Sequence, residues 1–141
     1  VIEWILNNIP MDYIKEFALG IKAGSIVRSD EGRWVNLNGY DSGCGVEWEK
    51  TKRFFGNRCA YCGEEAPLVP EHIVPQTVMS TVDPRRVDLS ENIVCCCSAC
   101  NREKGTQEMH EFYRKSKGYS KYRLGRIHEW QRMHRISELP E

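Results

Sequence analysis

The sequence predicts one small α+β domain in which two short strands and several helices are held together by a bound metal ion. Two Cys-x-x-Cys pairs, Cys59 with Cys62 and Cys97 with Cys100, have the spacing of paired ligands in a tetrahedral zinc site. Apolar and β-branched runs lie between the two pairs, and helical apolar spacing lies on either side. The length of 141 residues fits a single compact domain.

Residues 1–57 are expected to form a mostly helical accessory segment. Apolar residues at near-helical intervals predict a helix over 9–23, and a short strand is expected over 33–37. A second helix over 45–55 should end at Gly56-Asn57 and lead the chain into the first Cys-x-x-Cys pair.

Residues 58–107 are expected to form the core of the domain. Two strands are predicted, over 68–73 and 92–96, because these runs are rich in apolar and β-branched residues. The connection over 75–90 is expected to be a loop that reaches outward. A helix should then begin at Ser98 or Ala99 and run to about residue 107.

Residues 108–141 are expected to form a basic helical segment. Gly118 should interrupt the helical pattern, and a last helix is predicted over 120–135. Apolar residues of this helix, Ile127 and Trp130, are expected to pack on the core, as are the other tryptophans.

The overall charge of zero conceals an uneven distribution. Residues 102–135 contain ten Lys and Arg against four Asp and Glu, a net +6, whereas residues 1–50 have a net −3. A local basic face can bind phosphate even when the whole chain is neutral, so nucleic acid remains a candidate partner. A solvated charged face is the alternative explanation. The candidate contacts are Arg102, Lys104, Arg114, Lys117, Lys121 and Arg132.

Seven cysteines, an odd number, favour metal binding over a disulfide framework. Cys59, Cys62, Cys97 and Cys100 are assigned to Zn²⁺, and Cys95 and Cys96 are expected to be packing residues. Four buried apolar cysteines are the alternative. With all four positions filled by thiolates, the zinc would be structural. No export signal or membrane-length apolar run is visible, which predicts a cytoplasmic protein without a membrane partner.

Between the two cysteine pairs, an acid stands next to a histidine at the end of the first predicted strand. The imidazole of His72 can remove a proton from water near neutral pH. The carboxylate of Glu71, with the amide oxygen of Asn101, would suit a hard cation such as Mg²⁺. Adjacent residues of a strand face opposite ways, so Glu71 and His72 can address one site only where the strand ends in a distorted loop.

Together these residues resemble the HNH endonuclease family. The resemblance covers about residues 58–105 and rests on motifs in a specific order. These are Cys59-Ala-Tyr-Cys62, Glu71-His72-Ile73-Val74-Pro75-Gln76, Asn92-Ile93-Val94 and Cys97-Ser-Ala-Cys100-Asn101-Arg102-Glu103-Lys104-Gly105. The resemblance implies a ββα-metal core, in which a two-stranded hairpin and a helix grip one divalent cation.

The same resemblance implies a role for each matched residue. His72 would be the general base, and Asn92 would hold the loop and orient that base. Glu71 and Asn101 would bind the catalytic cation, Mg²⁺ or Mn²⁺. Glu71 stands where the family usually has Asp, and Asn101 where it often has His.

The implied reaction is metal-dependent hydrolysis of DNA phosphodiester bonds, with one strand nicked at each site. A homodimer is then one route to a double-strand break. A zinc-stabilised nucleic-acid-binding module without cleavage activity is the alternative function. It would share the cysteine pairs and the basic tail but would have no need of the acid, the histidine and the amide together. A zinc-stabilised protein-interaction module is a third possibility, and it would leave the basic tail unexplained as well.

Overall fold

The computed structural model describes residue 19 and residues 26–28, 30–32, 34–36 and 46–139. Apart from Leu19, which is helical, the helix expected over 9–23 lies outside these residues. The described elements are β1 (Ile26–Arg28), β2 (Trp34–Asn36), α3 (Val46–Phe54), β3 (Leu68–His72), α4 (Gln76–Val82), η1 (Pro84–Arg86), η2 (Ser90–Asn92), β4 (Ile93–Cys97), α5 (Ser98–Lys104), α6 (Met109–Tyr113) and α7 (Lys121–His134).

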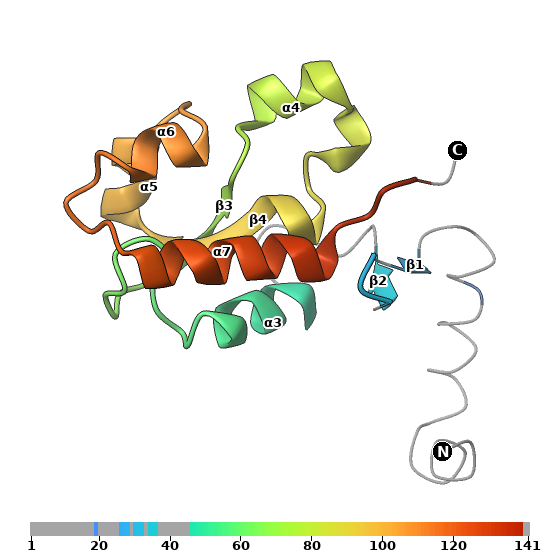
Figure 1. The fold of residues 1–141 in the computed structure, drawn as a ribbon, viewed down its shortest axis with the longest axis horizontal. Coiled ribbons are helices and arrows are strands. Elements are labelled where there is room, and N and C mark those ends of the chain that lie inside the picture. Colours follow the sequence, from blue (N-terminus) through green and yellow to red (C-terminus); the bar gives the residue numbers. More distant parts are fainter. Residues whose placement is uncertain (1–18, 20–25, 29, 33, 37–45, 140–141) are drawn as a thin grey trace, which may run out of the picture.

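The centre of the fold is an antiparallel pair of strands, β3 and β4, followed directly by α5 (Figure 1). Leu68 pairs with Cys97 at one end of the ladder, and His72 pairs with Ile93 at the other. The structure is therefore α+β, and its hairpin and following helix have the ββα order expected from the sequence.

The long helix α7 crosses the molecule beside β4, and α3 lies along the same side of the hairpin (Figure 1). Ile127 and Trp130 of α7 are buried in one core with Val94 of β4 and Tyr61. The indole N–H of Trp130 lies within hydrogen-bonding distance of the Ser90 and Ile93 carbonyl oxygens, at 2.7 and 2.9 Å. The predicted packing of the last helix is confirmed, and this helix also fixes the turn that enters β4.

Most predicted elements lie within one or two residues of the observed ones. The strand expected over 33–37 is β2, and it pairs with β1, which the sequence pattern did not predict. Helix α3 ends where Gly56 and Asn57 both adopt positive φ, 70° and 59°. The Ser120 side chain accepts a hydrogen bond from the Arg123 N–H and caps α7.

Two expectations in the middle of the chain were wrong. The connection over 75–90 is not a loop, since it contains α4, η1 and η2. The helix expected to reach residue 107 ends at Lys104, because Gly105 turns the chain away with φ +52°. A separate short helix, α6, follows.

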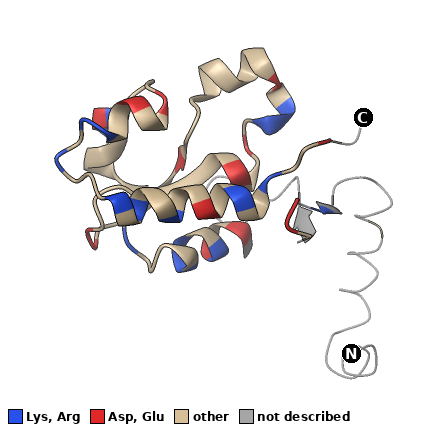
Figure 2. Ribbon diagram, in the orientation of Figure 1, with Lys and Arg blue, Asp and Glu red and all other residues tan. Residues whose placement is uncertain are grey.

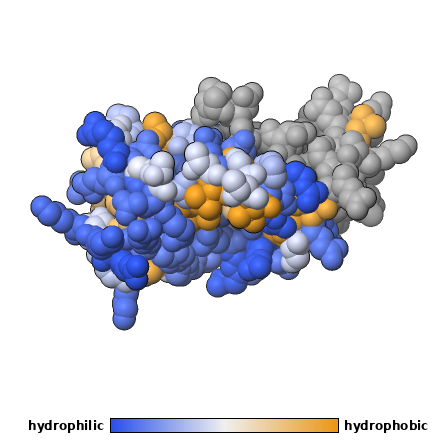
Figure 3. Space-filling view, turned by 90° about the horizontal axis from the view of Figure 1, so that it is seen from above, coloured by the Kyte–Doolittle hydropathy of each residue, from blue (hydrophilic) through white to orange (hydrophobic). Residues whose placement is uncertain are grey.

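Helix α4 escaped prediction because it has no buried face to give it apolar periodicity. None of its residues is buried, and Val78 and Val82 are 47% and 74% exposed. In the view from above, apolar surface is visible over this part of an otherwise hydrophilic face (Figure 3). Its sequence, Gln76-Thr-Val-Met-Ser-Thr-Val82, carries no charge.

Charged side chains are spread over α3, α5 and α7, with both signs on each helix (Figure 2). Among the described helices, none combines the length and the apolar character needed to span a membrane.

We expect Gly118→Ala to destabilise the protein. A Cβ at Gly118 would lie 3.1 Å from both Cα and Cβ of Cys62, so the backbone of the first cysteine pair would have to move. Overpacking of this kind typically costs about 1–3 kcal/mol. Gly125→Ala is the matched control: it lies within α7 with nothing within 4 Å, and should raise stability by about 0.5–1 kcal/mol. Thermal unfolding of both variants tests this, and equal Tm values would contradict it.

Candidate active site and zinc cluster

The four cysteines assigned to zinc converge at one end of the hairpin. Their Sγ atoms all lie within 4.8 Å of one another, and the Sγ atoms of Cys62 and Cys97 are 3.8 Å apart. A tetrahedral zinc with Zn–S bonds of about 2.3 Å places its sulfurs about 3.8 Å apart. The donor set and spacing therefore fit Zn²⁺, with no ligand position left for a substrate.

Backbone hydrogen bonds shape the first cysteine pair. Gly63, with φ +77°, donates its N–H to the Cys59 carbonyl oxygen, and Ala60 donates to the Cys95 carbonyl oxygen of β4. The Tyr61 carbonyl oxygen accepts two further bonds, from the Tyr113 hydroxyl at 2.6 Å and from Nε of Arg123 at 2.8 Å. Residues of α6 and α7 thus hold the pair in the shape that brings its thiols together.

The two neighbouring cysteines of β4 differ from the four clustered cysteines. Cys95 and Cys96 are buried outside the cluster, as predicted. Burial raises the pKa of Cys95 to about 12, which keeps it a thiol. Hydrogen bonds from the thiols of Cys100 and Cys96 lower the pKa of Cys59 well below its usual value. Thiolates are the form that binds zinc.

The residues expected to carry chemistry lie at the opposite end of the ladder. A cavity of about 390 Å³ opens where β3 ends, between the start of α4 and α5. Glu71, His72 and Asn101 all line it, together with Gln76 and Lys104. Adjacent residues within a strand point to opposite faces, but β3 ends at His72. The side chains of Glu71 and His72 can therefore both line this cavity.

Glu71 is buried, and both of its carboxylate oxygens have partners. Oε1 is 2.7 Å from Nζ of Lys104, and Oε2 accepts the Tyr61 hydroxyl at 2.5 Å. Burial raises the pKa of Glu71, and the Lys104 ammonium opposes that shift. Lys104 also donates to the His72 carbonyl oxygen at 2.8 Å.

Lys104 was expected from the sequence to contact phosphate at the surface, but in the structure it is buried. Its side chain is only 1% exposed. A charge this deeply buried is stable only when paired, and the pairing with Glu71 supplies that condition. Lys104 is the last residue of α5, and its side chain extends toward Glu71 and His72 of β3 instead of into solvent.

The His72 ring is oriented by a residue that the sequence reading missed. Nε2 of His72 lies 2.9 Å from Oδ1 of Asp88. The amide nitrogen of Gln76 lies 3.4 Å from the same His72 nitrogen. An ionised carboxylate can only accept a hydrogen bond, so this pairing assigns the hydrogen to Nε2 of His72 and leaves the lone pair on Nδ1. Asp88 falls in the stretch expected to be a loop, and no local pattern marks it.

Asn92 makes contacts that hold the chain after His72. Its Oδ1 accepts the Val74 N–H at 2.8 Å, and its Nδ2 donates to the carbonyl oxygens of Val74 and Val87 at 3.1 and 2.9 Å. Its own carbonyl oxygen accepts the Ile73 N–H. Asn101, on α5, is exposed and faces the cavity with an unburied amide.

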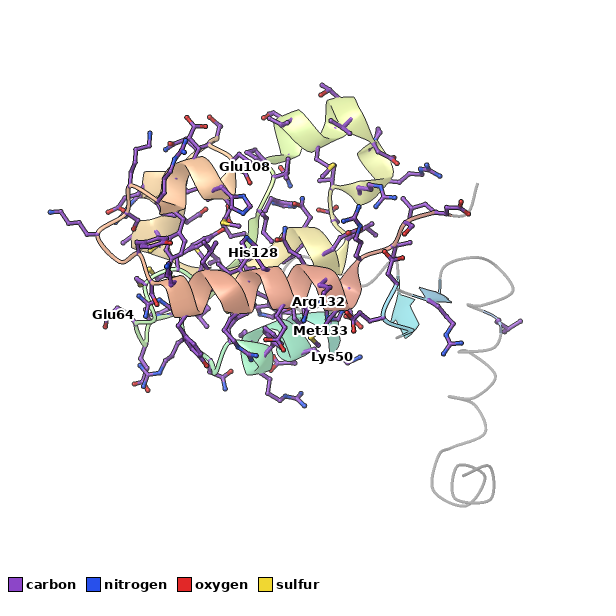
Figure 4. All side chains as sticks on the ribbon, in the orientation of Figure 1. Lys50, Glu64, Glu108, His128, Arg132 and Met133 are labelled. Carbon is purple, nitrogen blue, oxygen red and sulfur yellow. The ribbon has the colours of Figure 1, made fainter. Side chains whose placement is uncertain are left out.

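The remaining basic candidates are exposed but do not form one helical row. Arg114 caps the end of α6 and Lys117 lies in the connection, so the register breaks before Lys121 begins α7. Arg132 lies 3.2 Å from Glu31 and lines a groove of about 540 Å³ with His128. Figure 4 shows these two on α7. Arg102 is exposed on α5.

We expect the protein to contain about one zinc per chain, and Cys97→Ala to lose it. Removal of one thiolate leaves three ligands and an open position, which weakens metal binding and destabilises the hairpin end. Elemental analysis and Tm provide the measurements. Cys95→Ala, two residues earlier on the same strand, should keep its zinc. If the natively purified, folded protein contains no zinc, the assignment of the cluster is wrong.

No protein-family model matches the chain. A curated relative, the "SPbeta prophage-derived putative HNH endonuclease YoqL" of Bacillus subtilis (strain 168), is 32% identical over 91 residues. The match covers 60% of this chain and 40% of that protein, so the chain matches less than half of the relative's length.

Among solved structures, the Type II-C Cas9 enzyme from Actinomyces naeslundii matches with a TM-score of 0.47 and 21% identity. That match covers 92% of this chain and 14% of the Cas9 chain. The sequence resemblance to HNH endonucleases is confirmed by the curated relative, and the four-cysteine cluster at a ββα hairpin agrees with it.

Proposed function

We propose that this chain is a metal-dependent HNH endonuclease that hydrolyses DNA phosphodiester bonds. The observation that carries the proposal is the cavity at the end of β3, which an acid, a histidine with its own carboxylate partner and an exposed amide all line. The similarity to a relative named as an HNH endonuclease supports the same reaction class.

His72 is the general base in this proposal. With its Nε2–H donated to Asp88, the free Nδ1 accepts a proton from a water molecule, and the resulting hydroxide attacks phosphorus in line with the leaving 3′ oxygen. The products are a 5′ phosphate and a 3′ hydroxyl. Asp88 stabilises the imidazolium that forms and keeps the ring in the productive tautomer, as a carboxylate does for a catalytic histidine in general.

Glu71 and Asn101 are the proposed ligands of a catalytic divalent cation. Both offer oxygen donors, which suit Mg²⁺ or Mn²⁺ better than softer ions. Each carboxylate oxygen has two lone pairs, so Oε1 of Glu71 retains one after its contact with Lys104. When bound, the cation would supply charge neutralisation at the phosphate and stabilisation of the leaving oxygen.

The DNA backbone is proposed to lie against exposed basic residues of α5, α7 and the chain between them. Arg102 stands one residue beyond Asn101, and the other candidates are Arg114, Lys117, Lys121 and Arg132. One base and one cation at each site imply that each site cuts one strand, so a double-strand break would need two protomers or two encounters.

A zinc-stabilised nucleic-acid-binding module without catalysis is the alternative. It explains the cysteine cluster and the basic residues equally well. It gives no reason for a histidine to be paired with Asp88 beside a buried Glu71 and an exposed Asn101, and this arrangement favours the enzyme.

We expect nicking of supercoiled plasmid that requires Mg²⁺ or Mn²⁺ and is lost in His72→Ala, because this variant removes the imidazole that is proposed to take the proton from water. General bases contribute about 10²–10⁴-fold in rate. Gel electrophoresis of plasmid DNA measures the nicked form. Glu49→Gln, on α3 outside the cavity, should cut normally. If His72→Ala keeps its zinc and nicks the plasmid as fast as the wild type, His72 is not the general base.

We expect Asp88→Asn to lower kcat by at least about tenfold with little change in KM, since replacing the carboxylate behind a catalytic histidine by an amide can cost up to about 10⁴-fold. The neutral amide cannot stabilise the imidazolium. Asp88 is 60% exposed, so the variant should fold normally. Asp88→Glu should restore part of kcat, since it restores the carboxylate. A change in KM alone would instead assign Asp88 to DNA binding.

A further inference from the structure

Two histidines that the proposed hydrolysis does not use face each other across α6 and α7. Nε2 of His110 lies 2.7 Å from Nε2 of His128. The rings meet edge to edge through these two nitrogens, with centroids 5.0 Å apart and planes 29° apart. The pair is separate from both the cysteine cluster and the cavity that Glu71 lines.

A carboxylate fixes the orientation of the first ring. Glu108 precedes α6, and its Oε2 accepts the His110 backbone N–H at 2.8 Å, while its Oε1 lies 2.9 Å from Nδ1 of His110. Nδ1 therefore carries the hydrogen, and the Nε2 lone pair points at His128. Figure 4 shows Glu108 and His128 on the same side of α7. A carboxylate behind a histidine in this way is the usual outer partner of a metal-binding imidazole.

The second ring, that of His128, favours the neutral, ligating form. Burial, and then the neighbouring His110, lower the pKa of His128. Two neutral imidazoles with converging Nε2 atoms bind ions of the zinc, nickel and copper class, whereas Mg²⁺ prefers oxygen ligands. Zn–N bonds of about 2.0–2.1 Å place two nitrogens about 3.3 Å apart, so the two nitrogens would separate by about 0.6 Å and the rings would tilt until both lone pairs point at the ion.

We propose that His110 and His128 form a two-imidazole site for a borderline transition-metal dication such as Zn²⁺ or Ni²⁺, with water in the remaining positions. No third His, Cys, Asp or Glu completes the set within the part of the chain that the structure describes. The affinity should accordingly be modest, in the micromolar range.

A metal at this position would clamp α6 to α7 beside the proposed catalytic strand. The Met109 N–H donates to the Ile73 carbonyl oxygen, one residue after His72. His128 lines the 540 Å³ groove together with Val74 and Asn92. The clamp would therefore join the two helices that border the chain leaving His72.

The test uses the full chain with its cysteine cluster already loaded with zinc and free metal removed. Ni²⁺ is titrated by isothermal calorimetry, and Tm is followed in parallel. We expect one additional site per chain, a Tm rise of several degrees at saturating Ni²⁺, and loss of both effects in His110→Ala and His128→Ala. Glu108→Gln should weaken binding by about 10- to 100-fold.

Glu111→Gln, on the exposed side of α6, is the matched control and should bind Ni²⁺ normally. Equal stoichiometry in the wild type and in the His110→Ala/His128→Ala double variant would overturn the proposal and leave the pair as an N–H···N hydrogen bond. The readout is binding and not DNA cleavage, so the result is independent of the proposed hydrolysis.

Discussion

The pairing register of β3 and β4 is the constraint on which the candidate site depends. The ladder places Leu68 opposite Cys97 at one end and His72 opposite Ile93 at the other. A shift of one residue would turn every side chain of a strand to the other face. Zinc bound in the cysteine cluster would oppose such a shift, because Cys97 is both a strand residue and one of the four clustered cysteines, and the ligand geometry of zinc tolerates little displacement.

The other end of the ladder is held by a buried ion pair. Glu71 and Lys104 are 5% and 1% exposed, so both charges have lost most of their hydration. Such a pair is seldom a net source of stability, whereas loss of one partner typically costs about 3–5 kcal/mol. The ion pair instead fixes the positions of the residues around it. Lys104 also donates a hydrogen bond to the His72 carbonyl oxygen, and so links the end of α5 to the residue proposed as the base.

Local patterns in the sequence predicted the features that depend on neighbours along the chain. The Cys-x-x-Cys spacing, the apolar strands and the helix of Ile127 and Trp130 are all of this kind, and the structure has them within one or two residues. Asp88 could not be found in this way, because it meets His72 across sixteen residues, with α4 and η1 between them. Lys104 could not be assigned to the interior either, since a lysine in an exposed-looking helix end carries no sign of its burial.

The basic tail, residues 102–135, has a structural role as well as a charge. Its net +6 suggested a surface for phosphate, yet several of its charges are committed to the fold. Arg123 donates to the Tyr61 and Gly118 carbonyl oxygens, and Arg126 donates to the Phe54 carbonyl oxygen and lies 3.9 Å over the Phe54 ring. These contacts hold the first cysteine pair and α3 against α7. The tail therefore contributes to the scaffold of the site as well as to its charge, and fewer of its guanidinium groups are available for direct contact with a phosphate backbone than composition implies.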